Sequence, residues 1–65
     1  MNQFEYMHRA HKALAMFAFN LDMKVISATI EAGSIEICGF VGDYSCTRTY
    51  TFSSLASLES QAYGF

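Results

Sequence analysis

The sequence predicts a small α+β domain in the order α-β-β-β-α, with a three-stranded antiparallel meander covered on one face by two helices. Apolar residues recur at helical spacing near both ends of the chain, and β-branched residues with strand periodicity fill the middle. Two glycine-containing turn signals, Glu31 to Ser34 and Val41 to Tyr44, divide this middle part into three strands. The segment from Ser34 to Phe40 lies between the turns, so we expect it to be the central strand.

Length and composition indicate a single domain spanning residues 1–65. The chain has 65 residues, of which 52% are hydrophobic and 15% charged, with no proline. This composition is typical of a folded chain and not of a disordered one. A domain of this size buries only about 60% of the surface that its unfolded chain exposes, so its core supplies about 3–5 kcal/mol of net stability. A partner subunit would add to that small margin.

Residues from Gln3 to about Leu21 have the spacing of an amphipathic helix. The apolar residues that recur every three or four positions, which we expect to face the sheet, are Met7, Ala10, Leu14, Phe17 and Leu21. Met16 and Phe19 fall in the middle and on the shoulder of the opposite side, where a surface helix normally presents polar side chains to water.

The first turn sets the register of the first two strands. It places Ile30 opposite Ile35 and Ala28 opposite Ile37, which brings the isoleucines onto one face. Because side chains alternate along a strand, Ile26 should share that face with Ala28 and Ile30. We therefore expect all five residues to be buried beneath the helices.

The second turn is predicted to be a two-residue type II′ turn at Gly42 and Asp43, because this turn requires glycine at its first central position. The resulting inner row comprises Ile35, Ile37, Val41, Tyr44, Cys46, Tyr50 and Phe52. Arg48 is the one charged residue in this row. We expect its stem to lie on the sheet with the guanidinium at the margin; the alternatives are an ion pair with Glu59 or Asp22, or a contact with a partner.

The C-terminal part is predicted to be a second, short helix. Ser53 and Ser54 are suitable N-cap residues, and Gly64 suits the position after a helix end. The apolar positions at helical spacing are Leu55, Leu58 and Ala62. A helix of this length is stable only when it packs on another element.

Two histidines and two cysteines are the candidate metal ligands. His8 and His11 are three residues apart on the first helix, so they reach one side of it. The predicted register places Cys38 and Cys46 on opposite faces of the sheet, which disfavours both a disulfide between them and a four-ligand zinc site. We predict no metal and no other cofactor, and keep a small metal- or ligand-binding protein that uses His8, His11 and a cysteine as the alternative function.

Other classes of function are disfavoured by composition and motifs. The four basic residues form no run, whereas a nucleic-acid-binding protein normally has a basic face, so nucleic-acid binding is only a third hypothesis. The longest apolar run, from Ala13 to Phe19, is far shorter than the about 20 residues that span a membrane. We find no nucleophile with a base and no phosphate-binding loop, and predict a protein that is not an enzyme. Two free thiols are typical of a reducing compartment, so we predict a cytoplasmic protein.

Apolar residues outside the predicted core are the strongest functional signal. A contiguous apolar patch on a small domain usually marks an interface. The residues that we assign to it are Phe4, Met16, Phe19, Met23, Val25, Phe40 and Arg48. The alternative is pairing of another chain with the edge of the third strand, which carries Thr47, Thr49 and Thr51. We therefore predict a small protein-interaction module, self-associating as a homodimer, that acts as a regulator or inhibitor of another protein, such as an accessory protein of a mobile element.

Overall fold

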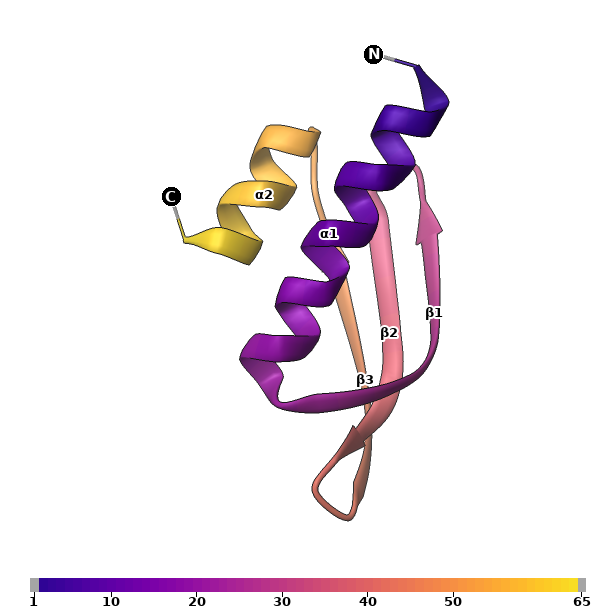
Figure 1. The fold of residues 1–65 in the computed structure, drawn as a ribbon, viewed down its shortest axis with the longest axis vertical. Coiled ribbons are helices and arrows are strands. Elements are labelled where there is room, and N and C mark those ends of the chain that lie inside the picture. Colours follow the sequence, from indigo (N-terminus) through magenta and orange to yellow (C-terminus); the bar gives the residue numbers. More distant parts are fainter. Residues whose placement is uncertain (1, 65) are drawn as a thin grey trace.

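The structure, a computed structural model, describes residues 2–64 and confirms the predicted order α-β-β-β-α. Its elements are helix α1 (Gln3–Leu21), strands β1 (Met23–Glu31), β2 (Ser34–Val41) and β3 (Tyr44–Thr51), and helix α2 (Leu55–Tyr63). The strands form one antiparallel sheet in the order β1-β2-β3, with β2 in the centre. Both helices lie on one face of this sheet, so the molecule has two layers (Figure 1).

Capping residues define both ends of α1. The Asn2 side chain accepts a hydrogen bond from the backbone N–H of Glu5 at 2.8 Å, which satisfies one of the free donors of the first turn. Asp22 adopts the left-handed conformation at φ 55° and donates its backbone N–H to the carbonyl oxygens of Ala18 and Phe19. This residue ends the helix and turns the chain directly into β1.

Both predicted hairpin registers are confirmed. Ile30 pairs with Ile35 across the first turn, and Ile37 pairs with Arg48 across the second. Gly42 has a φ of 63° while the next residue keeps a negative φ, as a type II′ turn requires. Ile35 and Ile37 are completely buried, because the central strand lies under the helices.

A β-bulge in β1 changes which of its residues face the core. Val25 pairs with Gly39 and Ser27 pairs with Cys38, so Ile26 is an extra residue without a partner on β2. The prediction that Ile26 is buried is wrong: it is 68% exposed. The simple alternation that we assumed for β1 holds only after the bulge.

The same bulge brings Met23 into the core. Because the alternation is shifted by one residue, Met23 shares the inner row with its partner Val41 and is only 8% exposed. Our expectation that Met23 belongs to an exposed patch is therefore wrong. Beyond the bulge, Ala28 keeps its predicted partner, but the prediction that it is buried is wrong: it is exposed, because β1 is an edge strand that the helices do not cover there. Ile30 is half-buried against the core.

Gly39 makes room for the β1 backbone at the bulge. A Cβ atom at this position would lie 2.1 Å from the carbonyl oxygen of Lys24 and 3.0 Å from the Cα atom of Val25. Contacts with backbone atoms at such distances cannot be relieved by moving a side chain. Glycine is thus the residue that lets β1 approach β2 at this point.

The core lies between the helices and the central strand. Its buried members are Ala10, Ala13, Phe17, Met23, Ile35, Ile37, Leu55, Leu58 and Ala62. Phe17 stacks on Tyr50 of β3, with ring centroids 3.8 Å apart and ring planes inclined by 8°. Helix α2 buries the three residues that its apolar spacing predicted. On α1, Ala10 and Phe17 of the predicted row are buried together with Ala13, whereas Leu14 and Leu21 are half-buried against the core. Met7 of the same row is also half-buried.

Helix α2 has the predicted caps and is tied to α1 and the sheet. The Ser54 hydroxyl oxygen accepts the backbone N–H of Ser57 at 3.2 Å, and Gly64 ends the helix at φ 81°. The Gln61 side chain donates to the carbonyl oxygen of Thr51 at 3.0 Å. These bonds orient a helix that is too short to be stable alone.

Polar side chains join the two helices. Arg9 donates two hydrogen bonds to the Glu59 carboxylate, of which the one from Nε is 3.0 Å long. Asn20 donates to the carbonyl oxygen of Ala62 at 3.1 Å. The hydrogen bonds from Arg9 lower the pKa of Glu59, and the same bonds raise the pKa of Arg9.

The β2–β3 hairpin extends past the helices. The molecule measures 39 × 23 × 16 Å, and the turn between β2 and β3 forms one tip of its long axis (Figure 1). Tyr44 lies next to this turn and is 80% exposed, although it belongs to the inner row opposite Val41. Side chains of the inner row are therefore buried only where a helix covers them.

Candidate interaction surface

The residues that the sequence assigned to an interface lie in three different environments. Phe4 and Phe19 on α1 are each 79% exposed. Met16 is half-buried and packs against the core, and Met23 is buried, as described above. Among these four residues, only Phe4 and Phe19 thus leave most of their surface in water.

Met16 is covered because α2 packs on its side of α1. Arg9 and Asn20, which contact α2, are seven residues before and four residues after Met16 on the same side of the helix. The sequence places Met16 among polar residues and so suggests a solvated position. Those polar residues instead bind α2, which the sequence pattern did not reveal.

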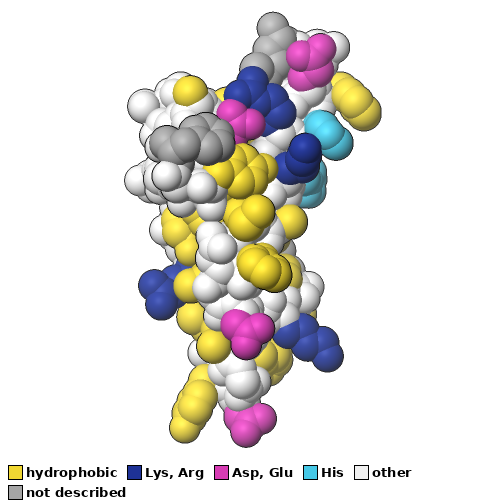
Figure 2. All heavy atoms as spheres, turned by 60° about the vertical axis from the view of Figure 1, so that its left-hand side comes forward, with side chains coloured by type: hydrophobic (Ala, Val, Ile, Leu, Met, Phe, Trp, Pro, Cys, Tyr) yellow, Lys and Arg dark blue, Asp and Glu magenta, His cyan; other side chains and the backbone are white. Residues whose placement is uncertain are grey.

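The solvent-facing side of α1 carries a continuous row that we call the outer stripe. It consists of Phe4, His8, His11, Ala15 and Phe19, which follow one another at spacings of three or four residues. All five are exposed. The rings of Phe4 and His8 are stacked, with centroids 6.5 Å apart and planes inclined by 3°. The histidine side chains (cyan) are seen on the surface in Figure 2.

The charged residues of α1 lie beside the outer stripe and not within it. Glu5 and Lys12 are exposed on one side of it, and Arg9 lies further round, bound to Glu59. A surface helix normally turns its most polar side to water. Here that side carries two phenylalanines, two histidines and an alanine, so much of it is apolar.

The remaining predicted interface residues lie on the sheet and do not join the outer stripe. Val25 and Phe40 are 37% and 39% exposed, but Val25 pairs with Gly39 and Phe40 pairs with Lys24. They therefore do not meet across the strands and do not form a joint patch. Arg48 is exposed on β3, and its proposed partner Glu59 binds Arg9 instead.

The candidate metal ligands are not brought together. His8 and His11 are exposed on α1, whereas the cysteines lie on the sheet, where Cys38 pairs with Thr47 and Cys46 with Gly39. Within residues 2–64, no group of three or more histidine, cysteine or acidic side chains is placed to hold a metal ion. Both cysteines are free thiols.

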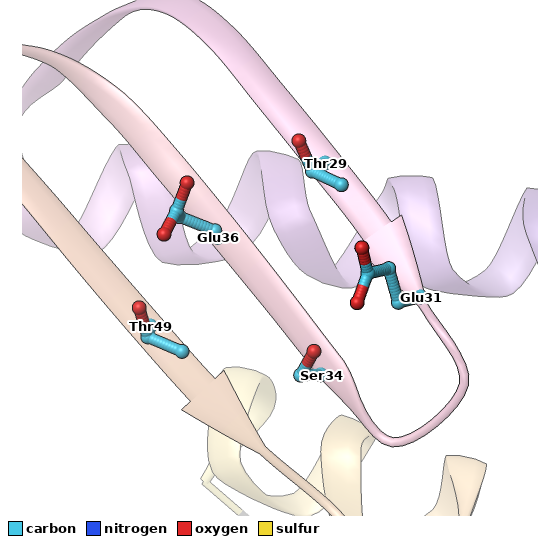
Figure 3. A pocket seen from close by; sticks show the side chains of 5 residues that line it. All are labelled: Thr29, Glu31, Ser34, Glu36 and Thr49. Atoms are coloured by element: carbon cyan, nitrogen blue, oxygen red, sulfur yellow. The ribbon is translucent and has the colours of Figure 1, made fainter.

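A shallow hollow of about 200 Å³ lies on the face of the sheet away from the helices. Figure 3 shows its lining residues on all three strands, namely Thr29, Glu31, Ser34, Glu36 and Thr49. Thr29, Glu36 and Thr49 are partners across the strands. Their side chains offer hydroxyl and carboxylate oxygens that water can solvate. Glu36 and Thr49 alternate with residues of the predicted inner row, so the predicted register is consistent with their position on this outer face.

Comparison with protein-family models, with curated proteins and with solved structures found no match for this chain. Among the described residues, no helix is both long and apolar enough to cross a membrane. The surface of the molecule is therefore the basis for a functional interpretation.

Proposed function

We propose that this chain is a non-enzymatic, self-associating protein-interaction module that acts as a regulator or inhibitor of another protein, and that the outer stripe of α1 is a surface through which it binds protein. The observation that supports this proposal is the exposure of Phe4 and Phe19 on one face of one helix. Covering an apolar side chain of this size contributes about 1.5–3 kcal/mol. Two such residues on one stripe supply a binding energy comparable to the stability of a domain this small.

The electrostatics of the molecule are consistent with a binding role. Arg9 and Glu59 are the described groups with clearly shifted pKa values, and they bind each other between the helices. Strongly shifted groups at a catalytic site would instead face a cleft. We place the module in the cytoplasm, because its two free thiols suit a reducing compartment.

Affinity capture from cells that produce the tagged chain tests the proposal. The wild type is compared with Phe19→Asp, which puts a charge on the outer stripe, and with Tyr44→Asp, which puts the same charge on an equally exposed aromatic residue of the hairpin. We expect Phe19→Asp to lose the specific partner and Tyr44→Asp to keep it. Capture of the same proteins by all three folded chains would refute the assignment of the outer stripe.

A further inference from the structure

We infer that the outer stripe of α1 binds the outer stripe of a second copy of this chain, with the two helices antiparallel about a two-fold axis. This inference rests on the proposed function and names the partner, which is a second copy of the chain with the same stripe. The stripe runs from Phe4 to Phe19, about 22 Å along the helix at 1.5 Å per residue. A second helix of the same length covers it completely.

Four of the five positions in the stripe are symmetric about the midpoint between His11 and Lys12, whereas His11 itself comes to lie opposite Lys12 on the border. Phe4 and Phe19 lie equally far from this point, and so do His8 and Ala15. When two copies pair antiparallel about it, Phe4 of one copy lies beside Phe19 of the other. His8 lies opposite Ala15, so a ring meets a small side chain. A surface that is its own complement in this way is what a two-fold interface requires.

The size of the stripe also fits a dimer. Aromatic side chains bury about 150–250 Å² each, so the four phenylalanines of two copies supply about half of the roughly 1,200–2,000 Å² that stable interfaces bury. The rest comes from the residues between and beside them.

Charges are compatible with this arrangement. The outer stripe contains no carboxylate and no lysine or arginine. Two Lys12 side chains come near the two-fold axis, but they lie on the border of the stripe, and their flexible stems let the ammonium groups separate in water. Glu5 lies on the same border, nearer the helix end.

Cysteine cross-linking tests both the partner and the direction of pairing. In a background with Cys38→Ser and Cys46→Ala, one tagged protein carries His8→Cys and a second, differently tagged, carries Ala15→Cys. Both positions are exposed, so the fold tolerates the change. A disulfide forms only where Cβ atoms come within about 4.5 Å of each other. After mixing and mild oxidation, we therefore expect the ratio of mixed dimers to self-paired dimers to exceed the ratio for random pairing by at least about fivefold.

Three results overturn the inference. An excess of self-paired dimers indicates a parallel arrangement of the two helices. Mixed and self-paired dimers in random proportions, formed to the same extent as dimers of a Ser45→Cys control on the sheet, indicate random collision. Absence of cross-links in folded proteins shows that a second copy does not occupy the stripe. None of these results bears on the capture experiment with Phe19→Asp, which tests binding of any partner, so the two proposals can fail separately.

Discussion

Ile37 is the residue on which the stability of the monomer depends most. It lies in the middle of the central strand, is completely buried and pairs with residues on both neighbouring strands. Truncation of such a side chain costs about 2–5 kcal/mol, which is close to the whole stability expected of the domain. We predict that Ile37→Ala largely unfolds the chain at 25 °C, as measured by circular dichroism in a thermal melt.

Ile26 provides the matched control for Ile37. It is the same residue type in the neighbouring strand, but it is exposed at the bulge. We expect Ile26→Ala to change the free energy of unfolding by no more than about 0.5 kcal/mol. Equal destabilisation by the two substitutions would mean that the core is not centred on β2.

Gly39 tests the bulge directly. We predict that Gly39→Ala destabilises the domain by at least the about 1–3 kcal/mol typical of overpacking, because the added Cβ atom meets the β1 backbone. Urea denaturation measures the loss. Thr49→Ala, an exposed change on the neighbouring strand, serves as the control. A Gly39→Ala protein as stable as the wild type would show that the β1 backbone does not approach β2 at Gly39 as closely as described.

At the scale of the elements, the sequence was sufficient to predict the strand registers but not the β-bulge in β1. The hairpin registers were predictable, because the turn glycines and the burial of Ile35 and Ile37 allow one solution. The bulge was not predicted, although a glycine inside a strand, here Gly39, is a known signal for one. That single extra residue accounts for the misplacement of Ile26 and Met23, whereas Ala28 is exposed because the helices do not cover the β1 edge there.

The stabilisation that the Arg9–Glu59 ion pair contributes to the fold is expected to depend on pH. The pKa of Glu59 is lowered in the folded state by its hydrogen bonds with Arg9, so the bridge stabilises the fold above the unfolded carboxyl pKa of about 4.3. This contribution is lost as the pH falls through the lower pKa of the folded state. We predict that wild type and Glu59→Gln differ in unfolding free energy at pH 7, and that this difference shrinks as the pH falls below about 4.3.

Chemical denaturation at several pH values checks the prediction for Glu59. Glu31→Gln, which removes an exposed carboxylate far from the helix pair, is the matched control and should leave the wild-type profile nearly unchanged. A difference between wild type and Glu59→Gln that stays constant from pH 7 to pH 2.5 would show that the bridge does not contribute through its charge.

At the scale of the whole molecule, the candidate surface was predictable only in part. Helical spacing identified Phe19 as an apolar residue outside the core, and Phe4 as another. It did not reveal that α2 covers Met16, since contacts between distant helices have no local signature. The position of α2 is what confines the exposed apolar surface of α1 to one stripe.

The central claim is that the outer stripe of α1 is a protein-binding surface on which two copies associate. Sedimentation equilibrium over a range of protein concentrations measures this association most directly, with wild type, Phe19→Asp and Tyr44→Asp compared at neutral pH. We predict a monomer–dimer equilibrium for wild type and Tyr44→Asp, and a folded monomer for Phe19→Asp with association weakened at least about tenfold, or about 1.4 kcal/mol. If wild type and Phe19→Asp sediment as the same folded monomer at every concentration, self-association through this stripe is refuted.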